Sequence, residues 1–185
     1  MRITGSLLAL ALLGPPLLAS GAAAATPPKA SIAQRLLKME DESAIRRILV
    51  QYGAYLDARD FAHYAALFAR DGEWIGGYGH FTGPAQIQKM LEEKIGKGGP
   101  DYINFESYHL MSNPLIEIVG DKAHVVSKFM STRKSSDNKP APGLSGRSVD
   151  DFVRENGEWK VRRRVTHGQI PWRDGDEPVP AGPRP

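Results

Sequence analysis

Apolar residues recur at helical spacing in the first half of the chain. One stripe lies on a single face of a predicted helix over residues 40–57 and consists of Ile45, Ile48, Leu49, Tyr52 and Leu56. A short second helix is predicted over residues 61–68, with Asp60 as its N-cap. A third helix is predicted over residues 85–94, and a short strand over residues 73–75 precedes it. The first half is therefore expected to be mainly helical.

The second half of the chain alternates between apolar and polar positions, as strands do. Four strands are predicted, over residues 103–119, 123–133, 147–154 and 159–166. The last two are joined by Asn156-Gly157, a pair typical of tight hairpins, whereas residues 134–146 read as a polar loop. Three helices followed by antiparallel strands predict an α+β domain. A strongly curved sheet wrapped around helices would leave a pocket between them.

The first 25 residues have the layout of a secretory signal peptide. Arg2 precedes an apolar run, and a stretch of small residues follows and ends at Ala25. The alternative is a membrane anchor, but the apolar run is short and Gly14-Pro15-Pro16 interrupts it. We interpret residues 1–25 as a cleaved signal, and we expect a periplasmic or secreted protein without a membrane attachment.

The rest of the chain reads as one domain between two tails. Residues 26–38 are expected to be a linker, residues 39–170 the domain, and the proline-rich residues 171–185 a disordered tail. The net charge of +3 is evenly spread, which argues against a nucleic-acid partner. The densest basic run, residues 160–164, is interpreted as a solvated strand face rather than a phosphate site. The absence of cysteine excludes disulfides, thiol chemistry and an acylated-cysteine anchor.

Asp57 and His109 are the candidate proton-transfer pair. Asp57 stands at the end of the first predicted helix, and His109 lies in the first long strand. If the fold brings them together, the carboxylate fixes the tautomer of the imidazole, which then takes or gives a proton near neutral pH. The residues alone leave an alternative, in which Asp57 closes the helix or pairs with Arg59 and His109 is a hydrogen-bonded core histidine.

Five segments together resemble a known family. They are residues 56–61, 64–74, 81–87, 109–114 and 120–125. Their order and spacing resemble the SnoaL-like branch of the NTF2-like superfamily, which includes scytalone dehydratase and a dehydrochlorinase. The resemblance covers nearly the whole expected domain. It implies a cone-shaped α+β barrel, in which N-terminal helices pack on a curved antiparallel sheet around an apolar cavity, often in a homodimer. Such a fold hosts many functions, so it fixes none.

The resemblance also implies roles for individual residues. Asp57 and His109 match the aspartate and the catalytic histidine of the dehydratases and the dehydrochlorinase. Trp74 stands where the dehydrochlorinase has a pocket tryptophan. Two positions depart from scytalone dehydratase: Arg133 lies near its second histidine, and Leu56 replaces the tyrosine before its aspartate.

Further substrate contacts are expected around this pair. Tyr52 lies one turn before Asp57, and Met111 is expected in the apolar lining. Asn113 shares strand parity with His109 and would face the cavity, unless the strand bulges before Pro114. Arg133 is a candidate cation for an anionic ligand, as are Arg147 and Arg164, and the sequence does not choose among the three. The remaining histidines are scattered, so neither a metal site nor a cofactor is expected.

Two functions follow from these residues. The first is a cofactor-independent lyase, dehydratase-like, or isomerase that uses Asp57 and His109 as a general base on a hydrophobic cyclic small molecule. The alternative is a non-catalytic domain that binds such a molecule, which the departures at Leu56 and Arg133 favour. It predicts a carboxyl–imidazole separation too long for a hydrogen bond, or a cavity filled by the protein's own side chains.

Overall fold

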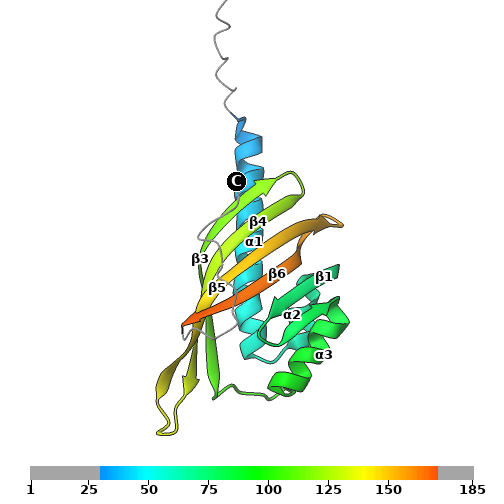
Figure 1. Ribbon diagram of the computed structural model, residues 1–185. Coiled ribbons are helices and arrows are strands. Elements are labelled where there is room, and N and C mark those ends of the chain that lie inside the picture. The colour runs from blue at the N-terminus through cyan, green and yellow to red at the C-terminus, as the bar shows by residue number, and fades with distance from the viewer. Residues whose placement is uncertain (1–29, 171–185) are drawn as a thin grey trace, which may run out of the picture. The chain divides into compact units, whose positions relative to one another are not determined.

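The computed structural model describes residues 30–170 of the chain (Figure 1). The described helices are α1 (Ile32–Asp57), α2 (Phe61–Ala66) and α3 (Pro84–Ile95). The described strands are β1 (Phe68–Gly76), β2 (Gly79–Thr82), β3 (Ser107–Val119), β4 (Lys122–Lys134), β5 (Pro140–Glu155) and β6 (Glu158–Ile170). The expected signal peptide and the expected C-terminal tail lie outside the described residues.

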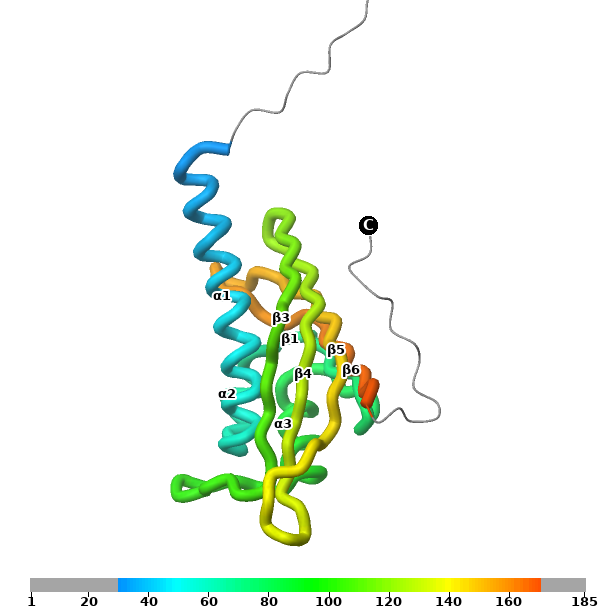
Figure 2. The backbone as a smooth tube through the Cα atoms, turned by 90° about the vertical axis from the view of Figure 1, so that its left-hand side faces the viewer, coloured from blue at the N-terminus to red at the C-terminus, as the bar shows by residue number. Residues whose placement is uncertain are grey.

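The strands form one six-stranded sheet in the order β2-β1-β6-β5-β4-β3. Helix α1 packs on β3, and α2 and α3 lie together beside β1 (Figures 1 and 2). The α+β class is therefore confirmed. The sheet is mixed rather than wholly antiparallel, because β1 pairs with β6 in parallel. The alternation of apolar and polar residues within a strand does not indicate whether a strand far away in the chain pairs with it in parallel or antiparallel.

Helix α1 begins at Ile32 rather than at the expected residue 40, so residues 32–38 of the expected linker (26–38) are helical. A capping box at Ser31 opens the helix: the backbone N–H of Gln34 donates to Ser31 Oγ at 3.2 Å, and Ser31 N–H donates to Gln34 Oε1 at 2.8 Å. The first turns carry exposed apolar side chains, including Leu36 and Leu37. They therefore add nothing to the buried stripe from which the start was predicted.

Two stretches of strand were not predicted from the sequence, namely β2 and the first residues of β5. Residues 76–79 turn the chain between β1 and β2, which pair as a hairpin. Strand β5 begins at Pro140, inside the loop predicted over residues 134–146, and continues the ladder with β4. Glycine residues in both segments, together with Pro140 and Pro142 in the second, hid the strand pattern. The predicted Asn156-Gly157 hairpin is confirmed, and both residues have positive φ, 51° and 85°.

The predicted stripe of α1 forms one wall of the core. Its buried members are Ile45, Ile48, Leu49 and Tyr52, and Leu56 packs against them partly buried. They pack against α2, α3 and the inner face of the sheet, where Val125, Phe152 and Val161 are buried. Among the described helices, none has the length and hydropathy of a membrane span.

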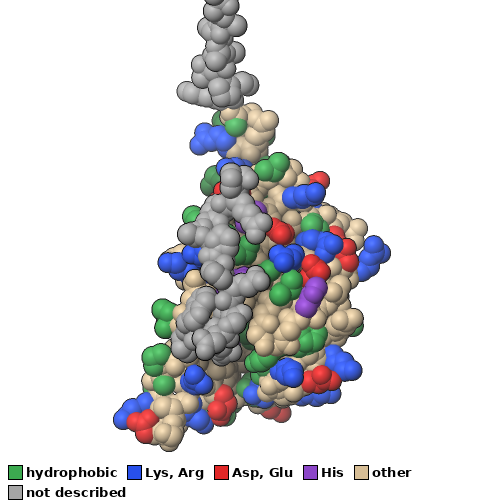
Figure 3. Space-filling view, in the orientation of Figure 1, with side chains coloured by type: hydrophobic (Ala, Val, Ile, Leu, Met, Phe, Trp, Pro, Cys, Tyr) green, Lys and Arg blue, Asp and Glu red, His purple; other side chains and the backbone are tan. Residues whose placement is uncertain are grey.

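The basic side chains of residues 160–164 do not all lie on the solvent-exposed face of the sheet. Three of its members pair with surface carboxylates: Lys160 with Glu158, Arg162 with Asp71 and Arg163 with Glu73. Basic and acidic side chains are interspersed over the face of the protein in Figure 3. Arg164 differs from these three, because it points inward and is fully buried.

Asp41 ties helix α1 to the β5–β6 hairpin. Its Oδ1 accepts hydrogen bonds from Arg154 Nη2 at 2.6 Å and from Trp159 Nε1 at 3.0 Å. The Arg154 guanidinium also lies 4.5 Å from the centre of the Trp159 ring. Burial works against the ionised carboxylate, but the hydrogen bonds from Arg154 and Trp159 outweigh it and hold the pKa of Asp41 below its usual value.

We expect Asp41→Asn to lower the free energy of unfolding by about 1.5–3 kcal/mol near neutral pH, because it removes hydrogen bonds to a charged group. A pKa lowered on folding makes this contribution complete above the unfolded-state pKa of about 3.9. The contribution is then lost as the pH falls through the folded value. Urea unfolding of the wild type and the variant, near neutral pH and at about pH 3, measures both the loss of unfolding free energy and its decrease in acid.

Asp121→Asn is the matched control for this prediction. Asp121 Oδ1 also meets Arg154, at 3.0 Å from Nε, but its side chain is 79% exposed. An exposed ion pair contributes at most about 1 kcal/mol. Equal effects of the two substitutions, or an Asp41→Asn effect that persists undiminished in acid, would contradict the assignment.

Candidate functional site

Asp57 and His109 are in direct contact. Asp57 Oδ1 lies 2.6 Å from Nδ1 of the His109 ring, and Asp57 Oδ2 accepts the backbone N–H of His109 at 2.9 Å. Both side chains are mostly buried, with 15% of Asp57 and 27% of His109 exposed. The long separation that a non-catalytic domain predicts is therefore not observed.

The ends of α1 and β3 meet because Gly53 lets them approach. Asp57 is the last residue of α1, and Gly53 lies one turn before it. A Cβ atom at Gly53 would lie 3.3 Å from the carbonyl oxygen of His109 and 3.7 Å from Cγ of Met111. Any larger residue at this position would push β3 away from α1. The missing side chain thus helps to set the distance between the carboxylate and the imidazole.

The contact defines which ring nitrogen of His109 can act as a base. In the neutral imidazole, Nδ1 carries the proton that it donates to Asp57, and Nε2 keeps its lone pair. Because Asp57 binds both the ring and the backbone of the same residue, the imidazole is held in one orientation. Asp57 would also stabilise the imidazolium formed when Nε2 takes a proton.

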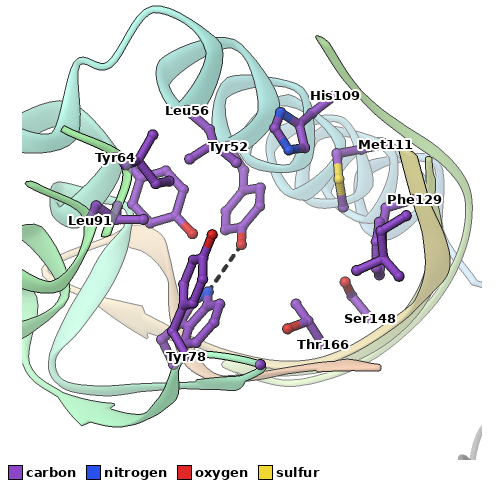
Figure 4. A pocket seen from close by; sticks show the side chains of 14 residues that line it. Tyr52, Leu56, Tyr64, Tyr78, Leu91, His109, Met111, Phe129, Ser148 and Thr166 are labelled. Atoms are coloured by element: carbon purple, nitrogen blue, oxygen red, sulfur yellow. Dashed lines mark hydrogen bonds between the residues drawn. The ribbon is translucent and has the colours of Figure 1, made fainter. Parts of the chain in front are cut away.

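His109 lies on the wall of a cavity of about 220 Å³ (Figure 4). The other lining residues are Tyr52, Leu56, Tyr64, Trp74, Gly77, Tyr78, Leu91, Ile95, Met111, Phe129, Leu144, Ser148 and Thr166. An engineered apolar cavity of about 150 Å³ binds benzene, so this volume suits a molecule of one or two small rings. The lining contains the predicted contacts Tyr52, Trp74 and Met111, and the cavity is not filled by side chains.

The structure places two predicted substrate contacts elsewhere. Asn113 is exposed and has a φ of 48°, at an interruption of the β3–β4 register between Ser112 and Leu115. This is the strand bulge that the sequence left open, and it ends the parity with His109. Arg133 is also exposed and lines a separate surface hollow with residues such as Asn104 and Glu106. Neither residue is among those that line the cavity.

A buried ion pair beside the cavity was not predicted from the sequence. Arg164 Nε and Nη2 donate to the two carboxylate oxygens of Asp150, at 2.7 and 2.8 Å, and both residues are 0% exposed. Burial alone would disfavour the charged guanidinium, but the Asp150 carboxylate outweighs it and raises the pKa of Arg164 above its usual value.

Tyr52 connects this ion pair to the cavity. Its ring centre lies 3.7 Å from Cζ of Arg164, and its hydroxyl oxygen accepts a hydrogen bond from Trp74 Nε1 at 3.1 Å. Figure 4 shows this bond as a dashed line at the cavity wall. Because Trp74 occupies only a lone pair, the Tyr52 hydroxyl keeps one proton that it can donate, either to the neighbouring Tyr64 or to a ligand oxygen. Burial raises the pKa of Tyr64 well above its usual value, so the Tyr64 hydroxyl stays protonated.

The described part of the chain contains no group of three His, Cys, Asp or Glu side chains placed to hold a metal ion. The other histidines that pair with carboxylates lie outside the cavity lining. They are His63 with Asp60, His80 with Glu73 and His124 with Asp151. His109 is thus distinguished from them by its place at the cavity, rather than by having a carboxylate partner.

Residues 38–165 match the model of the SnoaL-like domain family. The chain belongs to the SnoaL-like domain family. This confirms the family that the sequence motifs indicated. No curated protein matches the chain in sequence.

Solved structures agree with this assignment. An NTF2-like protein with a cystatin-like fold from Novosphingobium aromaticivorans has a TM-score of 0.65 and 22% identity, over 72% of this chain and 85% of that one. A scytalone dehydratase candidate from the same species has a TM-score of 0.56 and 29% identity, over 72% and 85%. LinA has a TM-score of 0.62 and 19% identity, over 80% and 95%. The SnoaL-like protein thus has the expected NTF2-like fold.

Proposed function

We propose that this SnoaL-like protein is a cofactor-independent lyase or isomerase in which His109 removes a proton from a carbon atom of a neutral cyclic substrate. The observation that carries the proposal is the 2.6 Å contact between Asp57 Oδ1 and His109 Nδ1 at the wall of an open cavity. The similarity to a scytalone dehydratase candidate supports a reaction of this class.

The proposed reaction begins when His109 Nε2 takes a proton from a carbon next to a carbonyl group. The electron pair of the broken C–H bond moves to the carbonyl oxygen, and the Tyr52 hydroxyl donates a hydrogen bond to the resulting enolate. If a leaving group stands on the next carbon, the enolate expels it and an alkene forms. If instead a carbon–carbon double bond is conjugated with the enolate, the His109 imidazolium returns the proton to the far carbon of that dienolate, and the double bond changes position.

The charge distribution of the cavity favours a neutral substrate. None of the side chains that line it belongs to lysine or arginine. Arg164, the buried cation nearby, is already paired with Asp150 through two hydrogen bonds. A carboxylate or phosphate would therefore enter this cavity without a cation to neutralise it, at a substantial desolvation cost.

A second candidate function is the binding of such a molecule without catalysis. It is favoured by the apolar Leu56 in the lining and by the exposed position of Arg133. These are the two positions at which the sequence departs from scytalone dehydratase. Under this alternative the cavity would bind a cyclic ketone and leave its C–H bonds unchanged.

Deuterium exchange into a probe ketone separates the two functions. We expect the wild-type protein to speed the incorporation of deuterium into 2-tetralone in D₂O, followed by proton NMR, because the Asp57–His109 pair can remove an acidic proton beside the carbonyl. An incorporation rate no higher than that of buffer would contradict the proposed catalysis. Saturable binding of 2-tetralone without exchange would identify the non-catalytic alternative.

We further propose that the protein forms a homodimer through the outer face of β3 and β4. Tyr108, Leu110 and Met130 are 58%, 43% and 45% exposed there, and Leu110 pairs with Met130 in the ladder. Strand β3 is an edge strand, so a second copy can reach this patch. Analytical ultracentrifugation should find a dimer that Leu110→Lys dissociates and Val50→Lys, on the exposed side of α1, does not. A wild-type monomer would contradict this proposal.

A further inference from the structure

Three hydroxyl side chains form a row across the inner face of the sheet. Ser127 on β4 pairs with Ser148 on β5, and Ser148 pairs with Thr166 on β6. Ser148 and Thr166 line the cavity, and Figure 4 shows them across it from His109. On one side of this row the lining is apolar, with Phe129 two residues beyond Ser127 on β4. The hydroxyl row is thus a polar strip in a mainly apolar cavity.

Two of these hydroxyls lack hydrogen-bond partners. Ser148 is 0% exposed and Ser127 is 1% exposed, and neither Oγ has a partner among residues 30–170. The third, Thr166 Oγ1, donates to the backbone oxygen of Ile75 at a long 3.3 Å. Folded proteins leave few buried hydroxyls unsatisfied, because each one destabilises the fold. Ser148 therefore combines a free donor, a free acceptor and a place on the cavity wall.

The local charges indicate what kind of group these hydroxyls can bind. The nearest buried charges, Asp150 and Arg164, neutralise each other through two hydrogen bonds, although Arg164 Nη1 has no partner among residues 30–170. A neutral hydroxyl or carbonyl oxygen matches serine, which both donates and accepts. A hydrocarbon edge or a halogen would leave the serine unsatisfied. Sites with buried polar groups discriminate strongly against ligands that lack the matching partner.

We propose that Ser148 and Thr166, the two members of the hydroxyl row that line the cavity, bind a neutral oxygen substituent on the substrate ring, across the cavity from the carbon that His109 deprotonates. This inference rests on the proposed function and narrows its substrate class. The substrate is a one- or two-ring molecule with two oxygen-bearing positions. One is the carbonyl beside the reacting carbon, and the other is a hydroxyl or carbonyl held by Ser148.

Ligands that differ in one ring substituent test this proposal. The probes are two derivatives of 2-tetralone, one with a hydroxyl and one with a chlorine at the same position of the aromatic ring, and titration calorimetry measures their Kd values. We expect the wild type to bind the hydroxyl derivative about three- to tenfold more tightly, which corresponds to one net hydrogen bond. Ser148→Ala should bring the ratio close to one, whereas Ser112→Ala, at an exposed position of β3, should leave it unchanged.

The thermal stability of the unliganded variants gives a second readout. Because Ser148 Oγ has no internal partner, Ser148→Ala should leave the Tm unchanged or raise it. A clear fall in Tm would show that the hydroxyl serves the fold, and would overturn the inference. A hydroxyl preference that survives in Ser148→Ala would also overturn it. Equal binding of both probes would overturn the inference alone, and failure of both to bind would overturn the proposed function with it.

Discussion

Arg164→Met should lower the free energy of unfolding by about 3–5 kcal/mol, because it leaves the fully buried Asp150 carboxylate without its cation. Methionine keeps much of the apolar volume of the arginine stem, so the loss reports the charge rather than a cavity. It also removes the guanidinium from beneath the Tyr52 ring. Guanidinium chloride unfolding near neutral pH measures the effect.

A double-mutant cycle separates this charge effect from packing. Buried ion pairs replaced on both sides by apolar residues often lose little or no stability. The double variant Arg164→Met, Asp150→Val should therefore be more stable than Arg164→Met alone. Arg163→Met is the matched surface control: this neighbouring side chain is 44% exposed and lies 3.6 Å from Glu73, so its loss should cost less than about 1 kcal/mol. A loss below 1 kcal/mol for Arg164→Met as well would contradict the role given to the buried pair.

His109→Ala should lower the rate of deuterium exchange into 2-tetralone by about 10²- to 10⁴-fold, the usual contribution of a positioned general base. Asp57→Asn should lower it by about 10- to 100-fold, because the imidazole then loses the partner that orients it. The rates come from the same NMR assay, at saturating ketone. Circular dichroism checks that each variant is folded.

His124→Ala is the matched control for this second prediction. His124 Nδ1 lies 2.8 Å from Asp151 Oδ1, so it has the same kind of carboxylate partner as His109, but it does not line the cavity. Its loss should leave the exchange rate within about twofold of the wild type, since surface substitutions of this kind change little. An exchange rate that His109→Ala leaves unchanged would mean that another group removes the proton.

The sequence predicted the central pair because the relevant signals are local. The helical stripe ends at Leu56, directly before Asp57, and the motif around His109 lies in a strand with clear alternation. The family resemblance then indicated that the two segments meet. The two segments can meet because Gly53 has no side chain, which lets α1 approach β3. In the sequence, however, a glycine inside a helix does not indicate which strand packs against it.

The features that the sequence did not predict depend on the register with which neighbouring strands pair. Counting from the buried Val161, strand parity would turn Arg163 inward, but the β5–β6 register shifts between Asp151 and Phe152 and Arg164 takes that place. The same kind of interruption turns Asn113 away from the cavity. A bulge changes the face of every residue beyond it; Pro114 left the bulge in β3 open as an alternative, whereas no local signal marks the one in β6. The sequence likewise contains no indication that β1 pairs with β6 in parallel.

The hydroxyl row and the His109 pair divide the cavity into two chemically different ends. In the proposed reaction, the base at one end acts on an acidic C–H bond, and the inferred site at Ser148 binds an oxygen atom at the other end. A molecule that satisfies both must be oriented in one way, because its reacting carbon and its second oxygen lie on opposite sides of the ring. Orientation of this kind contributes to catalysis as well as to selectivity.

The state of the His109 ring tests the central claim most directly, because it requires no knowledge of the natural substrate. Long-range proton–nitrogen NMR of ¹⁵N-histidine-labelled protein, at a pH where the ring is neutral, distinguishes the two tautomers, and a spectrum of His109→Ala assigns the signals. A ring held by Asp57 should carry its proton on Nδ1 and present an unprotonated Nε2 whose signal shifts when 2-tetralone is added. A proton on Nε2, or an Nε2 signal unaffected by the ketone, would contradict a general base directed into this cavity.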